Sequence, residues 1–515
     1  MSDHSVSPGD AAVGTDVESA SSDSVAAAVR DSLAERKTDG IRWEIVIGLE
    51  VHCELRTATK LFCGCRNSFG GEPNTNICPV CHGLPGSLPV LNRASVEYAI
   101  RIGAALHATT QASLFHRKNY FYPDMPKDYQ ISQYDLPINA GGWLTLPSGR
   151  QIGVVRAHLE EDTGKTTHVG GGGRIHEATR SLVDYNRAGV PLVEIVSAPD
   201  MRSAEEARAY VDELRSILVA TGASDGKMEE GSLRVDANVS VRPVGAEDFG
   251  TRCEIKNMNS LRSLGRAIEY EAARQIEVIE SGGTIAQETR HWDEGAGRTG
   301  SMRSKEEAFD YRYFPEPDLV PIDPSATWIA EVTSSLPAMP ADRRVRIAQM
   351  AGLDTDSEAV ITVVRLGLED LVEAIGDGGA NDSAPIAAIA VKRVANEVAS
   401  DLEGASRLNR PAFARLIRME ASGQLTSAQA RTVLRSMLDS GGEPEAIAVD
   451  LGFEAMGSGD LEGIVDAVVE AHPDEWSRFR GGEEKLTGFF IGHIKQASQG
   501  KADLKAASAL LRQRR

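Results

Sequence analysis

Hydrophobic and polar residues alternate along several short segments in the first half of the chain. Alternation with a period of two predicts β-strands, because successive side chains of a strand point to opposite faces of the sheet. Glycine, proline and asparagine lie between these segments, where the chain must turn. The expected strands are 44–55, 151–161, 181–197, 232–242 and 251–257.

Two other segments have the spacing of an amphipathic helix. In 203–221, apolar residues recur every three or four positions, and we expect Ser203 to cap the helix with Glu206 completing a capping box. A second helix is expected over about 261–280. Helices scattered among strands predict an α+β fold rather than a doubly wound α/β sheet.

The composition and the periodicity of the sequence change after Pro321. The remaining residues are rich in Ala, Leu, Glu and Arg and have helical periodicity, with acidic, glycine-rich loops at 376–383 and 440–444. The N-terminal segment is instead rich in Ser, Ala and Asp, a composition that predicts disorder. The expected organisation is a disordered extension at 1–40, a strand-rich domain at 41–325, a helical domain at 326–404 and a helical tail at 405–515.

The composition is that of an ordinary globular protein, since 41% of its 515 residues are hydrophobic and 25% are charged. The formal net charge of −20 means that any RNA contact needs a local basic patch, and no DNA partner is expected. No stretch reaches the ~18–20 apolar residues of a membrane span or the apolar run of a signal peptide. We therefore expect a cytoplasmic protein without a membrane partner.

Four of the six cysteines form two close pairs, Cys63 with Cys65 and Cys78 with Cys81. Two short pairs that face each other are typical of a zinc ion held by four thiolates, and such a closed site has no open position for catalysis. Free or redox-active thiols are the less favoured alternative, and disulfides fit a reducing compartment poorly. We expect a structural zinc ion in an insertion over 60–85.

One predicted strand carries three polar side chains on a single face. Glu50, His52 and Glu54 alternate with apolar residues in 44–55. Carboxylates at this spacing repel one another and destabilise the fold unless a cation or a charged substrate neutralises them. For a single strand, the alternative is a polar face exposed to water. A second run, 156–165, repeats the combination of imidazole, carboxylates and lysine, and this repetition favours a functional site.

Two further predicted strands carry isolated charges of both signs. Arg234 and Asp236 share one face of the first strand, and Glu254 and Lys256 share one face of the second. Magnesium takes oxygen ligands and shares them with nucleotide phosphates, so strands that each present one carboxylate are able to assemble such a site. The alternative for any one strand is ordinary surface charge.

Five ordered motifs together resemble one protein family. The chain resembles the GatB family, whose members belong to the tRNA-dependent amidotransferases that make Gln-tRNA or Asn-tRNA by transamidation. The match extends from 41 to about 322, with a weaker match at 485–503, and motifs of this length are far more specific than a single glycine pattern. The motifs are Val46–His52, Arg117–Pro123, His158–Lys165, Met228–Asn238 and Tyr311–Asp318.

The resemblance implies a fold and a reaction. The family has a cradle domain similar to glutamine synthetase, followed by a helical domain and a helical tail that contacts tRNA. It phosphorylates the side-chain carboxylate of misacylated Glu-tRNA(Gln) or Asp-tRNA(Asn) with ATP and Mg²⁺, and ammonia then displaces the phosphate. The implied partners are an amidase, which releases the ammonia from glutamine, and a third, small protein that completes the heterotrimer.

Carried over by motif position, the resemblance also implies roles for individual residues. The side chains expected to hold magnesium, at one or two positions, are Glu50, His52, Glu161, Asp236 and Glu254. The side chains expected to bind the nucleotide are Lys118, Lys165, Arg234 and Lys256. Catalysis is expected to depend on Glu50, His52, Glu161, Lys118 and Lys165. The four paired cysteines resemble those of the zinc-bearing members of the family.

Two alternative functions stay open at this point. In the first, the chain is a free-standing ligase for a small acid, similar to glutamine synthetase. In the second, it is a non-catalytic subunit for tRNA binding and assembly. The full set of carried-over metal ligands argues against the second alternative. The chain has no Ser-rich amidase signature, which independently indicates a partner that supplies ammonia. The tail departs from the family pattern, with His493 in place of the usual Gln.

Overall fold

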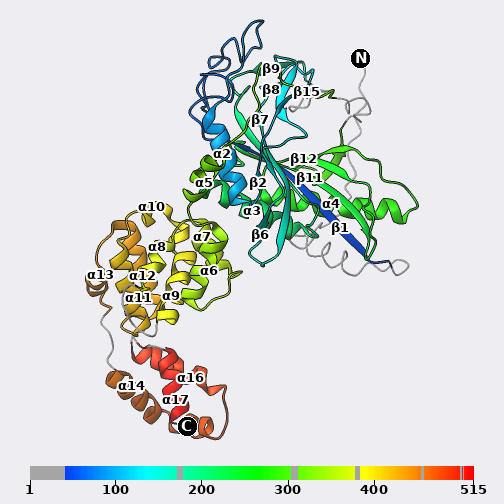
Figure 1. The fold of residues 1–515 in the computed structure, drawn as a ribbon. Coiled ribbons are helices and arrows are strands. Elements are labelled where there is room, and N and C mark those ends of the chain that lie inside the picture. The colour runs from blue at the N-terminus through cyan, green and yellow to red at the C-terminus, as the bar shows by residue number, and fades with distance from the viewer. Residues whose placement is uncertain are drawn as a thin grey trace, which may run out of the picture.

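The computed structural model describes residues 41–170, 178–302, 311–376, 383–453, 458–498, 502 and 504–514. The extension that is expected to be disordered, residues 1–40, lies outside the described residues. Figure 1 shows a sheet-rich body from the N-terminal half, a body of helices next to it, and a smaller group of helices that ends at the C-terminus. We call these parts the sheet domain, the helical domain and the tail.

A thirteen-stranded sheet forms the centre of the sheet domain. Its described strand pairs are antiparallel except for β12 with β13. In spatial order, the main path contains β14 (Arg298–Ser301), β13 (Thr289–Asp293), β12 (Cys253–Met258), β11 (Leu233–Pro243), β1 (Trp43–Glu54), β10 (Pro191–Ser197), β7 (Gln151–Glu161), β4 (Tyr129–Gln133), β3 (Phe115–Asn119) and β15 (Phe314–Pro315). The strands off this path are β2 (Thr109–Thr110), β5 (Asn139–Ala140) and β6 (Trp143–Thr145).

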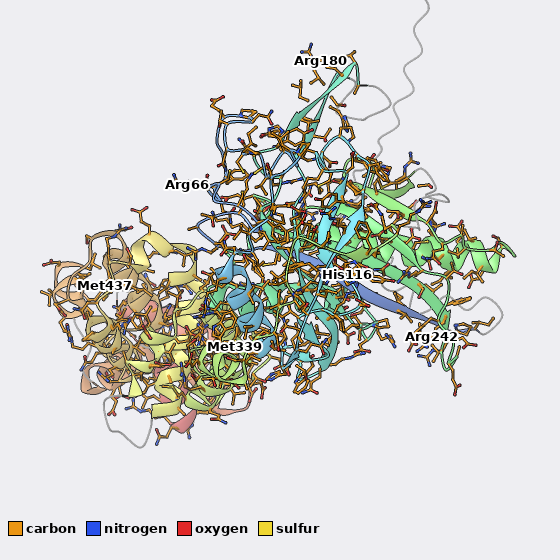
Figure 2. All side chains as sticks on the ribbon, turned by 45° about the horizontal axis from the view of Figure 1, so that its top comes forward. Arg66, His116, Arg180, Arg242, Met339 and Met437 are labelled. Carbon is orange, nitrogen blue, oxygen red and sulfur yellow. The ribbon has the colours of Figure 1, made fainter. Side chains whose placement is uncertain are left out.

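A separate two-stranded sheet projects from this body. Its strands are β8 (Lys165–Val169) and β9 (Arg180–Asp184), which pair antiparallel. Arg180 lies at the tip of this projection, at the top of Figure 2.

The alternation of apolar and polar residues locates most long strands correctly. β1, β7, β11 and β12 coincide to within two residues with the segments expected there. The single strand expected over 181–197 is wrong, because the chain forms β9 and β10 with a turn between them. Gly189 in that turn has a left-handed φ of 82°, which glycine adopts without strain, and Pro191 begins the second strand.

Three helices pack on the sheet through its apolar alternate residues, namely α2 (Arg93–Ala105), α3 (Ala204–Ala220) and α4 (Leu261–Glu280). The buried strand residues Leu49 and Ala237 belong to the same hydrophobic core as these helices. Ser203 caps α3 as expected, but the Glu206 carboxylate accepts from the Arg202 backbone N–H, so the expected capping box does not form. Because apolar residues face the helices, polar residues of the same strands face the other way.

The helices from α6 to α13 share a second hydrophobic core. Ile347, Val391, Leu416 and Leu434 are fully buried in it. The domain boundary expected at 404 therefore falls inside the helical domain, because residues on both sides of it pack together. The elements are α6 (Pro340–Ala351), α7 (Glu358–Arg365), α8 (Glu369–Glu373), α9 (Ser383–Asn396), the 3₁₀ helix η3 (Val398–Ser400), α10 (Leu402–Ala405), α11 (Arg410–Ala421), α12 (Ser427–Ser440) and α13 (Pro444–Asp450).

The sheet domain and the helical domain meet around Met339, at the start of α6 (Figure 2). The preceding helix, α5 (Ala326–Ser334), lies against α2, where the Arg93 guanidinium is 4.4 Å from the centre of the Trp328 ring. Arg344 of α6 donates a hydrogen bond of 2.5 Å to Glu213 of α3, and these side chains are only 5% and 4% exposed. A buried ion pair of this kind fixes how the two domains contact each other.

The tail has a third core of its own, formed by Val465, Phe479, Phe490, Ile494 and Leu511. Its helices are α14 (Ser458–Ala471), α15 (Pro473–Arg480), α16 (Leu486–Ala497) and α17 (Leu504–Gln513). Figure 1 places them beyond the helical domain, at the end farthest from the sheet. Among the described residues, the core of the tail is thus separate from that of the helical domain.

Across the described ranges, no helix is both long enough and apolar enough to cross a membrane.

Candidate active site on the open sheet face

Charged side chains from neighbouring strands lie next to one another on the sheet face opposite α3 and α4. β1 contributes Glu50 and His52. The antiparallel register places Asp236 of β11 opposite Glu50, and Glu194 of β10 opposite His52. His158 of β7 lies opposite Glu194 in turn. Side chains opposite each other across a strand pair are close enough to interact, so four strands contribute to one site.

Three side chains converge on one point of this face. His52 Nε2 lies 3.6 Å from Glu160 Oε1 and 3.7 Å from Glu194 Oε2, and the three ligand atoms lie within 4.8 Å of one another. Burial and the neighbouring Glu194 carboxylate raise the pKa of Glu160 to about 7. Burial also raises the pKa of Glu194, but His158, His52 and Arg156 outweigh it and lower that pKa overall, so Glu160 is the carboxylate that lacks positive charge. A divalent cation would supply it, and one imidazole with two carboxylates is a ligand set that such a cation accepts.

Glu161, which we expected to hold the metal, lies on the other face of β7. Adjacent residues of a strand point in opposite directions, so only Glu160 faces His52. Glu161 instead forms an ion pair with Lys127 and accepts a hydrogen bond of 2.8 Å from the Ile131 backbone N–H. The side chains of Lys127 and Glu161 are 8% and 4% exposed. The structure thus assigns Glu161 to a buried ion pair outside the cluster.

Asp236 and Glu254 lie close together, as expected for two ligands of one cation, but a lysine joins them. Lys256 Nζ is 2.6 Å from Asp236 Oδ2 and 2.8 Å from Glu254 Oε1. The second carboxylate oxygen of Glu254 accepts a hydrogen bond of 2.7 Å from Thr289 Oγ1. Burial lowers the pKa of Lys256, but the two carboxylates outweigh it and raise the pKa above its usual range. Lys256 is therefore charged.

Glu50 lies between the two groups of carboxylates. Burial, Glu194 and Glu254 raise its pKa, while Asn238 Nδ2 donates a hydrogen bond of 3.0 Å to Glu50 Oε1. Glu50 thus adds a third carboxylate to the group around Lys256. We call the following six side chains the charged row: Glu160, Glu194, His52, Glu50, Asp236 and Glu254.

Lys118 lies beside the first cluster of the charged row. Its Nζ is 4.7 Å from the centre of the Tyr311 ring. Burial lowers the pKa of Lys118, but the acidic groups around it, with Tyr313 and Glu160 foremost, raise it overall. The structure therefore keeps a positive charge next to Glu160.

Lys165 and Arg234 line an open cavity of about 750 Å³ at the Glu54 end of β1. Arg234 donates a hydrogen bond of 2.6 Å to Asp162, and Arg187 lies 3.3 Å from the same carboxylate. Burial and Asp162 raise the pKa of Glu54 to about 7. The lining of this cavity thus presents three cations, Lys165, Arg187 and Arg234, among five carboxylates, those of Glu54, Asp184, Glu229, Glu230 and Asp236.

A second cavity, of about 600 Å³, lies toward the Val46 end of β1 and reaches Glu50 of the charged row. Its lining includes Gly48, Glu50, Ser197, Asn238, Phe249 and Arg252. Along β1, this cavity contacts Glu50 and the first contacts Glu54, with His52 between them. Two ligands that enter from opposite ends would therefore meet at the charged row.

The four paired cysteines converge, as their spacing predicts. Cys81 Sγ lies 3.6 Å from Cys63 Sγ, 3.7 Å from Cys78 Sγ and 3.8 Å from Cys65 Sγ. Lys60, which is fully buried, places its Nζ 3.5 Å from Cys81 Sγ. This cluster can bind a metal ion, because four sulfur atoms lie within 4.8 Å of one another.

The segment 66–76, which lies between the cysteine pairs, forms part of the wall of the larger cavity. It is held by side chains at the end of β9. Asn74 N donates to Asp184 Oδ1 at 2.9 Å, and Asn76 N donates to Asn186 Oδ1 at 2.8 Å. The cysteine cluster is thus connected to the cavity through the backbone that it anchors.

Sequence reasoning did not single out Glu160 or Glu194. Glu194 is the one charged residue of β10, in which all other residues except Ser197 are apolar, and a lone charge in such a strand is a signal that could have identified it. His158 gives a second signal, because a period of two puts Glu160 on the same face as His158.

Comparison with known proteins identifies the family. Residues 45–330 match the family described as the GatB/GatE catalytic domain, and residues 368–514 match the GatB domain. The B subunit of the aspartyl/glutamyl-tRNA(Asn/Gln) amidotransferase of Carboxydothermus hydrogenoformans is 47% identical over 481 residues, which cover 91% of this chain and 98% of the relative. Proteins of the same name from Frankia casuarinae and Salinispora arenicola are each 49% identical, and each match covers 92% of this chain and 96% of the relative. The chain therefore belongs to the GatB family, the family of the B subunits of the aspartyl/glutamyl-tRNA amidotransferases.

Proposed function

We propose that this chain is a ligase subunit that amidates misacylated tRNA. With ATP and Mg²⁺ it phosphorylates the side-chain carboxylate of Glu-tRNA(Gln) or Asp-tRNA(Asn), and ammonia then replaces the phosphate to give Gln-tRNA(Gln) or Asn-tRNA(Asn). The observation that carries the proposal is the charged row between two cavities, inside the region that matches the catalytic domain. A carboxylate is a poor acyl donor, and phosphorylation converts one of its oxygens into a leaving group.

We infer that the charged row would hold two divalent cations. The first would be held by His52, Glu160 and Glu194, and the second by Glu50, Asp236 and Glu254. Bound there, such cations neutralise the phosphate oxygens and orient them during phosphoryl transfer. The protein contributes rigidity, because adjacent strands of one sheet space the ligands before any substrate binds.

The cations of the protein complete the charge balance. We infer that Lys118, which is buried beside Glu160, faces the phosphoryl group in transfer, where its fixed positive charge lowers the energy of the transition state. Lys165 and Arg234 would bind phosphates in the larger cavity, together with Arg187.

We infer that the four-cysteine cluster holds structural zinc. A tetrahedral site with Zn–S bonds of ~2.3 Å places neighbouring sulfur atoms ~3.8 Å apart. Cys81 lies 3.6, 3.7 and 3.8 Å from its three partners, which agrees with this geometry. All four positions would be filled by thiolates, so the ion would stabilise the loop and leave the chemistry to the charged row.

We further propose that the sheet acts as a cradle similar to that of glutamine synthetase, and that the tail contacts tRNA. The sheet supports the first point because one face is packed by helices and the other carries the site. The tail supports the second through exposed cations, which would contact phosphates rather than bases. These cations are Arg480, Lys485, Lys495 and Arg512.

The partners in this proposal are an amidase, which releases ammonia from glutamine, and a third, small protein of the same complex. The names of the relatives support it, because a protein named as one subunit of an enzyme implies a complex of several subunits. We place the reaction in the cytoplasm, where ATP and tRNA are available and the six thiols stay reduced.

The proposal is tested by separating its two steps. The full chain is incubated with ATP, Mg²⁺ and Glu-tRNA(Gln) or Asp-tRNA(Asn), with ammonium chloride in place of glutamine. We expect ADP release that depends on misacylated tRNA, and formation of the amidated tRNA. His52→Ala should abolish ADP release. If amidation proceeds only when another protein provides the kinase, and this chain merely increases tRNA binding, the chain serves assembly without catalysis and the proposal is wrong.

A further inference from the structure

We propose that Lys256 is a competitor for the second metal position, one that makes metal binding there depend on the nucleotide. Its ammonium group occupies the space between Asp236 and Glu254 in the ion-free protein. A divalent cation enters that space when a nucleotide phosphate draws the ammonium group away. This inference rests on the proposed function and adds a specific task for one lysine of the site.

The first argument is position. Lys256 Nζ is 2.6 Å from one carboxylate and 2.8 Å from the other, so it bridges the two ligands that a cation would bridge. A divalent cation placed between Asp236 and Glu254 would lie within a few ångströms of this ammonium group. Two positive charges at that separation repel strongly at a partly buried site. The ammonium group and the cation therefore exclude each other.

The second argument is that the backbone is shaped to present Lys256 in this way. The register between β11 and β12 shifts between Val235 and Ala237, which is a β-bulge on the β12 side. Asn257 in the bulge has a left-handed φ of 70°, and its side chain donates to the Trp292 carbonyl at 3.1 Å. Bulges near active sites re-aim side chains. Alternation places Lys256 on the face of Glu254, and the bulge that follows it turns Met258, two residues further on, into the core, so that Lys256 is the last side chain of β12 on this face.

The third argument is that the Lys256 ammonium group is able to move away from the two carboxylates. Its side chain is 34% exposed, whereas that of Lys127, which forms the ion pair with Glu161, is 8% exposed. Asp236 contacts the Lys256 ammonium group, and Asn257 follows Lys256 along the chain. Both residues line the cavity of about 750 Å³. A lysine has a flexible stem of four carbons, so its ammonium group is able to move from a carboxylate to a phosphate in that cavity.

The consequence is positive coupling between nucleotide and metal. Without nucleotide, Lys256 keeps Asp236 and Glu254 neutralised and the second divalent cation binds only weakly. With nucleotide, the ammonium group gains a phosphate partner and the two carboxylates become available to the cation. By thermodynamic linkage, the second cation then strengthens nucleotide binding by the same factor. The cluster of His52, Glu160 and Glu194 has no lysine bridging it among the described side chains, and its neighbour Arg156 lies 3.7 Å from Glu194 alone. This cluster should bind its cation in either state.

The test counts Mn²⁺ ions bound to the full chain, from the electron paramagnetic resonance signal of free Mn²⁺, without any substrate. The wild type should bind one ion tightly and a second roughly tenfold or more weakly, because Lys256 competes for the second position. Lys256→Met should bind both ions with similar affinity. Lys256→Arg keeps the charge and should behave as the wild type. Lys227→Met is the matched control, since Lys227 forms an exposed pair with Glu230 at 2.8 Å.

A second arm adds a non-hydrolysable ATP analogue, which should strengthen binding of the second ion to the wild type. The inference is overturned if the wild type binds two ions equally well without nucleotide, or if folded Lys256→Met binds its second ion no better than the wild type. If Lys256→Met unfolds without metal, rescue of its melting temperature by Mn²⁺ supports the inference, and failure of rescue refutes it. Amidation by the wild type is measured separately, so the proposed function and this inference can fail independently.

Discussion

Two adjacent carboxylates on β7, Glu160 and Glu161, should respond in opposite ways to the same substitution. Glu160 faces the charged row, whereas Glu161 faces the other way, toward Lys127. Replacing either with Gln removes a negative charge and keeps the size and shape of the side chain. The structure predicts that Glu161→Gln lowers stability and leaves metal binding unchanged, and that Glu160→Gln weakens metal binding and stabilises the ion-free protein.

The cost of Glu161→Gln follows from burial. The Lys127 side chain is 8% exposed and its partner 4% exposed, so neither group is solvated by bulk water. The amide of the new Gln would still accept from Ile131 N, but Lys127 would be left as a buried charge without an anion. Removing one partner of a buried ion pair typically costs about 3–5 kcal/mol in the free energy of unfolding. We expect a loss near the lower end, because the ammonium group also lies 5.2 Å from the centre of the Tyr129 ring.

The effect of Glu160→Gln follows from its pKa. Burial and Glu194 raise that pKa from an ordinary value of 4.5 to about 7. Between these two values the folded protein binds more protons than the unfolded one, so the free energy of unfolding falls as the pH rises from 4.5 to 7. The shift corresponds to about 3 kcal/mol at most, fully lost above pH 7. Gln does not titrate, so the variant should be more stable than the wild type at pH 8 when no divalent cation is bound.

The assay compares both variants with the wild type at pH 5 and pH 8, after magnesium and manganese have been removed by dialysis without a chelator. Hydrogen exchange of β4 and β7 under increasing urea reports the stability of the sheet domain separately from the helices. Mn²⁺ affinity is measured on the same samples, and we expect Glu160→Gln to lower it about a hundredfold. The reasoning is refuted if Glu161→Gln is the variant that loses Mn²⁺ while the stability of the sheet domain is unchanged.

Three other predictions concern the parts around the site. The Cys78→Ser variant should lose zinc, and hydrogen exchange of its residues 60–90 should increase, while its charged row still binds Mn²⁺. Zinc bound to this variant at the wild-type stoichiometry would contradict the four-thiolate site. A chain that ends at Phe453 should keep two folded domains, because the tail has its own core. It should bind tRNA more weakly, and its binding should depend less on salt concentration. Unchanged binding across a salt series would rule out tRNA contacts by the tail. Arg344→Met should destabilise the junction of the two domains by about 3–5 kcal/mol, because it leaves Glu213 buried without a partner. Adding Glu213→Leu should restore most of this stability. Unfolding of the single variant at the wild-type urea concentration would contradict the role of this pair.

Alternation along a strand was sufficient to locate β1, β7 and β11, since a strand between helices and an open face has one apolar and one polar side. The same rule identifies the face of each residue, which is why Glu50, His52 and Asp236 lie together as expected. It also separates Glu160 from Glu161, a distinction that motif position alone did not make. One residue along a strand reverses the direction of the side chain, so these two adjacent carboxylates have different partners, His52 for Glu160 and Lys127 for Glu161.

Other features depend on contacts that no local pattern records. The glycine-rich loop at 440–444 has the composition of a domain linker, but α12 and α13 on its two sides contribute Leu434 and Ala448 to one core. Glycine allows a turn within a domain as readily as between domains. The pairing of Glu213 with Arg344, more than a hundred residues later, is equally invisible in sequence. Long-range packing, rather than local propensity, sets these boundaries.

The charged row lowers the stability of the folded protein, and the fold shows what compensates for this loss. Burial raises the pKa of both Glu50 and Glu160, which means that each carboxylate is less stable as an anion here than in water. The opposite face of the same strands is a continuous apolar layer under α3 and α4, and its burial contributes far more stability than the row removes. Because each strand carries both faces, the position of the charges is fixed by the core behind them. Cations and phosphates then bind where the unbalanced charge already is, and the free energy released by neutralising it becomes available to orient the substrates. An open sheet with one packed face is therefore well suited to chemistry that brings two anions, a carboxylate and a nucleotide, into contact.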